Sequence, residues 1–229
     1  MRQDIEFPSQ GMHCRGWLYR PDDLEPGPGA PAIVMAHGFS AVKEMFGLDR
    51  YAERFCEAGF VTLVFDFRFL GASDGEPRGR IISHEQCEDI QNAMTCLARQ
   101  PHVDANRVGV RGTSYSGGHV LHLATIDPRI RAVVSQVPTI NPLEQVVRRS
   151  GPDSLQRLTA MLAADRERRF DGHPAGSVKA VAPQGEVSAL SVPEAFEAMS
   201  REAAEAPNWQ NTVTLDSLEG YVQYAPTAN

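Results

Sequence analysis

Four short, almost continuously apolar stretches recur along the first 140 positions. They read AIVMAHGF, FVTLVFDF, NRVGVRG and IRAVVSQV, at residues 32–39, 60–67, 106–112 and 130–137. Continuous apolarity over so short a length is typical of strands that are covered on both faces. Two earlier stretches, residues 4–9 and 13–21, flank Gly11 and predict an antiparallel pair ahead of the buried strands.

Between these stretches the apolar residues recur with the period of a helix. In residues 48–58 the apolar face consists of Leu48, Tyr51, Ala52, Phe55 and Cys56. Similar patterns predict helices at 83–97 and 116–125. Alternation of strand and helix predicts an α/β fold with a mostly parallel sheet, joined by right-handed crossovers.

After Pro138 the alternation stops. The pattern predicts a helix over 154–169, an irregular stretch and a second helix that ends near Ala204. We therefore expect a core at residues 1–140 and a helical lid at 141–210, inserted over the carboxyl edge of the sheet. Residues 211–229 are interpreted as a return segment toward the C-terminal part of the core.

Composition narrows the function classes. A net charge of −7 and a pI near 5.5 argue against a nucleic-acid-binding protein, which would carry a basic stripe. The cysteines lack the spacing of a metal site or a disulfide framework: Cys14, Cys56, Cys87 and Cys96. The sequence predicts neither a metal nor a cofactor. It shows neither a membrane-spanning apolar run nor a signal peptide, so we expect a cytoplasmic protein.

The candidate chemistry begins in the sequence GTSYSGG, residues 112–118, where a predicted strand meets a predicted helix. Ser114 has small residues two positions before and after it, as a nucleophile on a sharp strand-to-helix turn requires. Ser116 is the rival, because it lies between Ser114 and Gly118. We favour Ser114 because Gly112 closes the strand and residues 116–118 then open the helix.

Two further loops follow buried strands. In AHGFS, the backbone N–H of Phe39 is expected to join that of Tyr115 as an oxyanion donor, while His37 shapes the loop. In FDFRFLGASDG, we expect Asp66 and Arg68 to form a local ion pair that holds the loop.

The motifs HGFSAVKE, FDFRFLGASDG and GTSYSGGH together resemble the α/β-hydrolase superfamily. The nearest resemblance is to dienelactone-hydrolase-like and X-Pro-dipeptidyl-peptidase-like esterases and acyl hydrolases, over roughly residues 1–140. It implies Ser114 as the nucleophile, the amides of Phe39 and Tyr115 as the oxyanion hole, and a lid after Pro138. The implied activity is hydrolysis of a small ester, thioester or activated amide through an acyl-enzyme, with a small-molecule acyl substrate and no nucleic acid or membrane partner.

A general base and its orienting acid are missing from this pattern. The resemblance implies that they follow the lid, but the chain stops at GYVQYAPTAN, where the C-terminal strands would begin. The histidines after Ser114 are His119, His122 and His173; the first two are assigned to packing or solvent, and His173, beside Asp171, stays open as a base. Three aspartates have no suitably placed histidine after them: Asp153, Asp165 and Asp216.

These gaps leave alternatives. Without further strands, residues 130–137 become an exposed sheet edge, through which a homo-oligomer could form. The chain is interpreted as a fragment in preference to a naturally shortened protein, and its activity is expected to be impaired. A catalytically inactive, hydrolase-like binding or partner protein is the alternative function. A dehalogenase is disfavoured because it needs a carboxylate where Ser114 stands.

Overall fold

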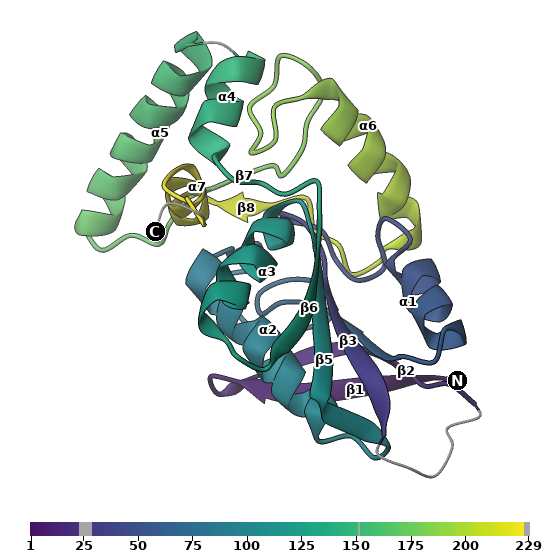
Figure 1. The fold of residues 1–229 in the computed structure, drawn as a ribbon. Helices are drawn as coiled ribbons and strands as arrows, with labels where there is room; N and C mark the ends of the chain where they lie inside the picture. Colours follow the sequence, from purple (N-terminus) through teal and green to yellow (C-terminus); the bar gives the residue numbers. More distant parts are fainter. Residues whose placement is uncertain (23–28, 151, 227–229) are drawn as a thin grey trace.

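A six-stranded sheet organises the computed structural model, which describes residues 1–22, 29–150 and 152–226 (Figure 1). Its strands in chain order are β1 (Arg2–Ser9), β2 (Met12–Tyr19), β3 (Ala30–Ala36), β4 (Val61–Phe65), β5 (Val103–Thr113) and β6 (Ile130–Gln136). Their order across the sheet is β1-β2-β4-β3-β5-β6. β1 and β2 are antiparallel to their neighbours, and the other four strands are mutually parallel. The predicted fold class and its antiparallel opening pair are confirmed.

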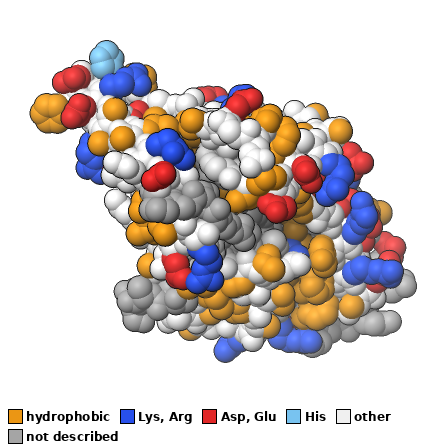
Figure 2. Space-filling model, turned by 90° about the horizontal axis from the view of Figure 1, so that it is seen from above, with side chains coloured by type: hydrophobic (Ala, Val, Ile, Leu, Met, Phe, Trp, Pro, Cys, Tyr) orange, Lys and Arg blue, Asp and Glu red, His pale blue; other side chains and the backbone are white. Residues whose placement is uncertain are grey.

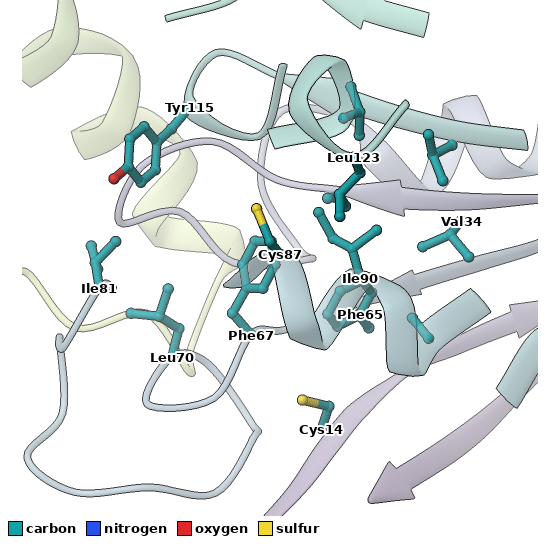
Figure 3. Close-up of a cluster of buried hydrophobic side chains, with 14 of the residues drawn as sticks. Cys14, Val34, Phe65, Phe67, Leu70, Ile81, Cys87, Ile90, Tyr115 and Leu123 are labelled. Atoms are coloured by element: carbon teal, nitrogen blue, oxygen red, sulfur yellow. The ribbon is translucent and has the colours of Figure 1, made fainter. Parts of the chain in front are cut away.

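Helices cover both faces of the sheet centre. α1 (Leu48–Glu57) packs on one face, where Leu48 joins Met35 and Val64 in a buried cluster. On the other face, α2 (Ser83–Ala98) and α3 (Tyr115–Ile126) pack against the alternate residues of the same strands. Figure 3 shows Ile90 and Leu123 from these helices near Val34 and Phe65 from the strands. Because side chains alternate across a strand, cover on both faces explains why these strands are apolar throughout.

The helical segment that follows β6 lies beyond the carboxyl ends of the parallel strands (Figure 1). It contains α4 (Pro142–Ser150), α5 (Pro152–Phe170), α6 (Pro193–Glu202) with the short 3-10 helix η1 (Ala203–Glu205), and α7 (Leu215–Val222). The strands β7 (Ser177–Val178) and β8 (Val213–Thr214) form a small antiparallel pair within it. Seen from above, hydrophobic side chains are interspersed with charged ones over this end of the molecule (Figure 2).

The last part of the chain belongs to the main core. Val213, Leu215, Leu218 and Tyr221 pack in the same buried cluster as the sheet and α2. In addition, the Ser217 hydroxyl accepts a hydrogen bond of 2.7 Å from the backbone N–H of Ile81. Residues 213–221 therefore hold the base of the helical segment against the sheet.

Strand β6 lies at the edge of the sheet, as the sequence predicts. Within the described ranges, no strand pairs with its outer side. Val134 on this strand is 48% exposed, and Val137 just after it is 73% exposed.

Among the residues that the structure describes, no helix combines the length and the apolar character that a membrane span requires.

Candidate active site

Ser114 occupies the junction between β5 and α3, after Thr113 and before Tyr115. Its backbone angles are φ 57° and ψ −113°, a conformation that costs about 1–3 kcal/mol for a residue other than glycine. The turn is so tight that a Cβ atom added to Gly112 would lie 2.0 Å from the carbonyl oxygen of Ser116. This crowding is the physical reason for small residues on both sides of Ser114.

The rival serine has a different environment. Ser116 is fully buried, and its hydroxyl donates a hydrogen bond to the carbonyl oxygen of His37. Ser114 is only partly buried, and its Oγ lies 3.5 Å from Oγ1 of Thr139. Of the two serines, Ser114 is therefore the one whose side chain reaches toward solvent.

The loop after β3 packs directly against this turn. A Cβ atom added to Gly38 would lie 3.2 Å from Cβ of Ser114, so the two backbones approach closely only because residue 38 is glycine. Phe39 follows, and its ring contacts that of Tyr115 edge-on at 5.5 Å. As the first residue of α3, Tyr115 has an N–H without an intrahelical acceptor. Within the described part of the chain, the N–H of Phe39 likewise donates no hydrogen bond to a backbone carbonyl oxygen.

A buried charge cluster supports the same loop. Asp66 is fully buried and accepts hydrogen bonds from the backbone N–H and the Nζ of Lys43, at 2.7 and 2.8 Å. His37 lies beside it, with Nε2 3.9 Å from Oδ1 of Asp66 and Nδ1 3.0 Å from the carbonyl oxygen of Gly38. Burial lowers the pKa of His37, so its ring is neutral at physiological pH. His37 thus shapes the loop, as expected from the sequence.

The expected ion pair between Asp66 and Arg68 is wrong. Asp66 pairs with Lys43, whereas Nε of Arg68 donates to Asp89 at 2.6 Å and its Nη2 donates to Glu88 at 2.9 Å. The two residues find partners on opposite sides of their loop: the loop after β3 for Asp66, and helix α2 for Arg68. Both charges nevertheless hold the loop in place, which is the role that the sequence suggested.

His119 does not contact Ser114, because both of its ring nitrogens have other partners. Nε2 lies 3.0 Å from Oε1 of Gln86, and Nδ1 lies 2.6 Å from the hydroxyl of Tyr224. The side chain is fully buried, and burial lowers its pKa to about 3. His119 is therefore a neutral core residue, as predicted.

The other two histidines lie elsewhere. His122 is half-buried on α3, and His173 is exposed in the turn after α5, where its backbone N–H donates to the carbonyl oxygen of Arg168 at 3.1 Å. The hydrogen-bond contact of the Ser114 hydroxyl is with Thr139. Among the residues that the structure describes, no histidine nitrogen is within hydrogen-bond reach of Oγ of Ser114.

The three aspartates considered as orienting acids are not grouped at the turn. Asp165 is buried, and its Oδ1 accepts a 2.7 Å hydrogen bond from the backbone N–H of Gly176. Asp216 lies in the first turn of α7, 3.9 Å from the guanidinium of Arg80. Asp153 lies in the first turn of α5. Over the described ranges, no three His, Cys, Asp or Glu residues are grouped so that they could hold a metal ion.

The amino-acid sequence of the chain matches a known family. A sequence profile of the X-Pro dipeptidyl-peptidase (S15 family) matches residues 12–222. The chain belongs to this family. The resemblance expected from the sequence is thereby confirmed.

Three known proteins are similar to this S15-family chain over nearly its whole length. It is 32% identical over 223 residues to the quorum-quenching protein AidA of Acinetobacter baumannii, covering 97% of this chain and 72% of that protein. It is 30% identical over 231 residues to a thiohydrolase of Eupenicillium brefeldianum, covering 98% and 71%. The crystal structure of the α/β hydrolase GrgF from Penicillium sp. sh18 superposes with a TM-score of 0.79, at 27% identity, over 99% of this chain and 74% of that one. Together they support an α/β-hydrolase enzyme.

Sequence reasoning missed two residues at the turn of this S15-family chain. The carbonyl oxygen of Gln136 accepts a 2.9 Å hydrogen bond from the N–H of Ser114, and Thr139 contacts the serine hydroxyl. Gln136 is the last residue of β6, the neighbour of β5, and Thr139 lies in the loop that follows it. The general rule that ligands bind beyond the carboxyl ends of parallel strands could have singled out this loop.

Proposed function

We propose that this chain is a serine hydrolase that cleaves a small ester, thioester or activated amide through an acyl-enzyme at Ser114. The observation that carries this proposal is the strained, partly exposed position of Ser114 between β5 and α3. In the proposed reaction, Oγ of Ser114 attacks the acyl carbon and its proton passes to a base in solution. An alcohol or amine then leaves with a proton returned by that base, whereas a thiol leaves as the thiolate. Water then releases the acid and restores the serine hydroxyl.

The backbone N–H groups of Phe39 and Tyr115 are proposed to hold the negative oxygen that develops during both steps. Their support is the close packing of Gly38 on Ser114 and the position of Tyr115 at a helix N-terminus. Such a terminus carries a partial positive charge, which favours an anion. Losing one oxyanion donor typically slows acyl transfer by about 10²–10³-fold.

Deprotonation of Ser114 is the slow step in the proposed reaction. A serine hydroxyl is a poor nucleophile unless a base takes its proton. Among the described residues, no histidine lies within hydrogen-bond distance of Oγ of Ser114, whose contact is with Thr139. We therefore propose that this chain acylates slowly. An added soluble base should accelerate the step, because it replaces the contact that the described residues do not supply.

Among the three acyl classes, we propose thioesters first. A relative of this chain is named a thiohydrolase. In addition, a thiol has a pKa near 8.5 and leaves as a thiolate without help from a proton donor, unlike an alcohol or an amine. A site in which no histidine contacts the serine hydroxyl is thus best matched to a thiolate leaving group.

Residues 141–210, within the helical segment, are proposed as a lid over the acyl group, because they lie beyond the carboxyl ends of the strands.

An acylation experiment tests the proposal. The chain would be incubated with an activated acetyl thioester, with and without imidazole, and intact-protein mass spectrometry would follow the acyl adduct. We expect an adduct on Ser114 whose formation imidazole accelerates, and no adduct at this position in Ser114→Ala, which lacks the attacking oxygen. Ser177→Ala, which removes an exposed hydroxyl from β7, is the matched control and should acylate normally. Equal acylation of the wild type and Ser114→Ala would contradict the proposal.

The setting proposed for this activity is the cytoplasm. The four cysteines are free thiols, and burial raises the pKa of the Cys87 thiol to about 12. Such a thiol stays protonated and unreactive. These features suit a reducing compartment better than an oxidising one.

A hydrolase-like binding protein is the second candidate function. The exposed edge of β6 favours it, because an open strand edge is a template for pairing with another chain. In this reading two copies associate through antiparallel β6 strands. Native mass spectrometry should then show a dimer, and Val134→Lys should shift it to monomer. A wild-type protein that is monomeric at tens of micromolar would remove this candidate.

A further inference from the structure

The end of β6 and the loop after it hold Ser114 from both sides. The N–H of Ser114 donates to the carbonyl oxygen of Gln136 at 2.9 Å, and the carbonyl oxygen of Ser114 accepts from the N–H of Thr139, also at 2.9 Å. Between these residues, Val137 has a φ of 43°, in the region that β-branched residues avoid. We call residues 136–139 the brace, because the chain turns here and both the carbonyl oxygen of Gln136 and the N–H of Thr139 bond to the strained residue Ser114.

Thr139 is the brace residue whose side chain faces the serine hydroxyl. It is 5% exposed, and its Oγ1 lies 3.5 Å from Oγ of Ser114. Its carbonyl oxygen lies against Gly118, where an added Cβ would come within 2.6 Å. Backbone contacts on both sides therefore fix the position of Thr139, and a β-branched side chain has little rotational freedom of its own.

We propose that Thr139 is a positioning residue, which holds the Ser114 hydroxyl in the rotamer from which it attacks the acyl carbon. This inference rests on the proposed function of Ser114. A serine side chain has three staggered rotamers, and a partly exposed hydroxyl exchanges between them within nanoseconds. A fixed hydroxyl beside Oγ favours one rotamer and leaves the other lone pair of Oγ directed at the substrate.

The alternative is that Thr139 only fills space. Valine has nearly the shape of threonine and would fill the same space without a hydroxyl, whereas serine keeps the hydroxyl and loses a methyl group. The two substitutions therefore separate positioning from packing. A matched control lies on the same turn: the hydrogen-bond contact of the Thr113 hydroxyl in the described structure is with Oε1 of Gln136, at 3.5 Å, and that of the Ser114 hydroxyl is with Thr139.

The test measures imidazole-assisted acylation by the acetyl thioester as a function of thioester concentration. Thr139→Val should lower the maximal acylation rate roughly 5-fold, the factor that one modest hydrogen bond supplies, and leave the half-saturating concentration unchanged. Thr139→Ser should stay within about 2-fold of the wild-type rate. Thr113→Val should acylate like the wild type, and melting temperatures would confirm that all variants are folded.

The outcomes separate this inference from the proposed function. If Ser114→Ala fails to acylate while Thr139→Val acylates at the wild-type rate, the positioning role is overturned and the nucleophile stands. If the valine and serine variants are slowed equally, the methyl group matters rather than the hydroxyl, and the inference is again overturned. If Ser114→Ala acylates normally, the proposed function itself fails. A slow valine variant with a near-normal serine variant supports the inference.

Discussion

Strands β4 and β6 run parallel in the same sheet and have similarly apolar sequences, VTLVF and IRAVVSQ. All five residues of β4 are buried, whereas every residue of β6 is partly or fully exposed. β4 lies between β2 and β3, with α1 on one face and α2 on the other. β6 has β5 on one side and α3 on one face, and its outer side is open in the described structure.

The difference teaches what an apolar run can and cannot reveal. Apolarity shows that a strand is compatible with cover on both faces, because exposed apolar area is unfavourable in water. It does not show where the cover comes from. The described chain covers both faces of β4 but only one face of β6, so similar patterns end in different environments.

The largest expected effect comes from one substitution made in both strands. Val64→Ala in β4 should reduce the free energy of unfolding by about 2–3 kcal/mol, because it removes two buried methyl groups and leaves a cavity beside Met35 and Leu48. Val134→Ala in β6 should change it by less than about 0.5 kcal/mol, since that side chain is half exposed. Urea unfolding of both variants measures the contrast. Equal losses would mean that β6 is covered in solution.

Much of the fold and of the turn could be predicted because the signals are local. The alternation of apolar runs and helical periods predicted a mostly parallel sheet with helices between its strands, and the small residues around a serine predicted the strand-to-helix turn at Ser114. Gly112 illustrates the link, since the crowding that demands glycine acts between neighbours in the chain.

The parts that sequence reasoning missed depend on contacts between distant segments. Asp66 pairs with Lys43 and Arg68 with Asp89, and neither partner lies within the motif that suggested an Asp66–Arg68 pair. Thr139 reaches Ser114 because β5 and β6 are neighbours and the brace folds back over the turn. Spacing along the chain contains no record of such contacts.

The second prediction concerns the short loop between α3 and β6. At its start, Asp127 accepts hydrogen bonds from Nε and Nη2 of Arg129, at 2.9 and 2.6 Å, and this contact lowers the pKa of Asp127 to about 2. The usual value is about 3.9, so the folded protein prefers the charged form. The stabilisation is complete above about pH 4 and is lost as the pH falls toward 2, because the unfolded chain binds the proton first.

Asp127→Asn isolates this contribution. The difference in unfolding free energy between the wild type and the variant should shrink by about 1 kcal/mol between pH 5 and pH 2.5, a figure reduced for the partial exposure of Arg129. Other carboxylates titrate in both proteins, so the difference, measured by urea unfolding, is the informative quantity. A difference that is constant over this range would show that the contact with Arg129 does not lower the pKa of Asp127.

The smallest expected effect is a gain in stability where β6 ends. Val137 is 73% exposed and has a φ of 43°, so it contributes little burial while its backbone is strained. Val137→Gly should raise the free energy of unfolding by about 0.5–1 kcal/mol, because glycine removes the strain at some entropic cost, and should raise the melting temperature by about 2–3 °C. Val134→Gly, in the extended part of the same strand, is the control and should lower it. A loss of stability in Val137→Gly would mean that this side chain is covered in solution, which would erase the contrast with β4.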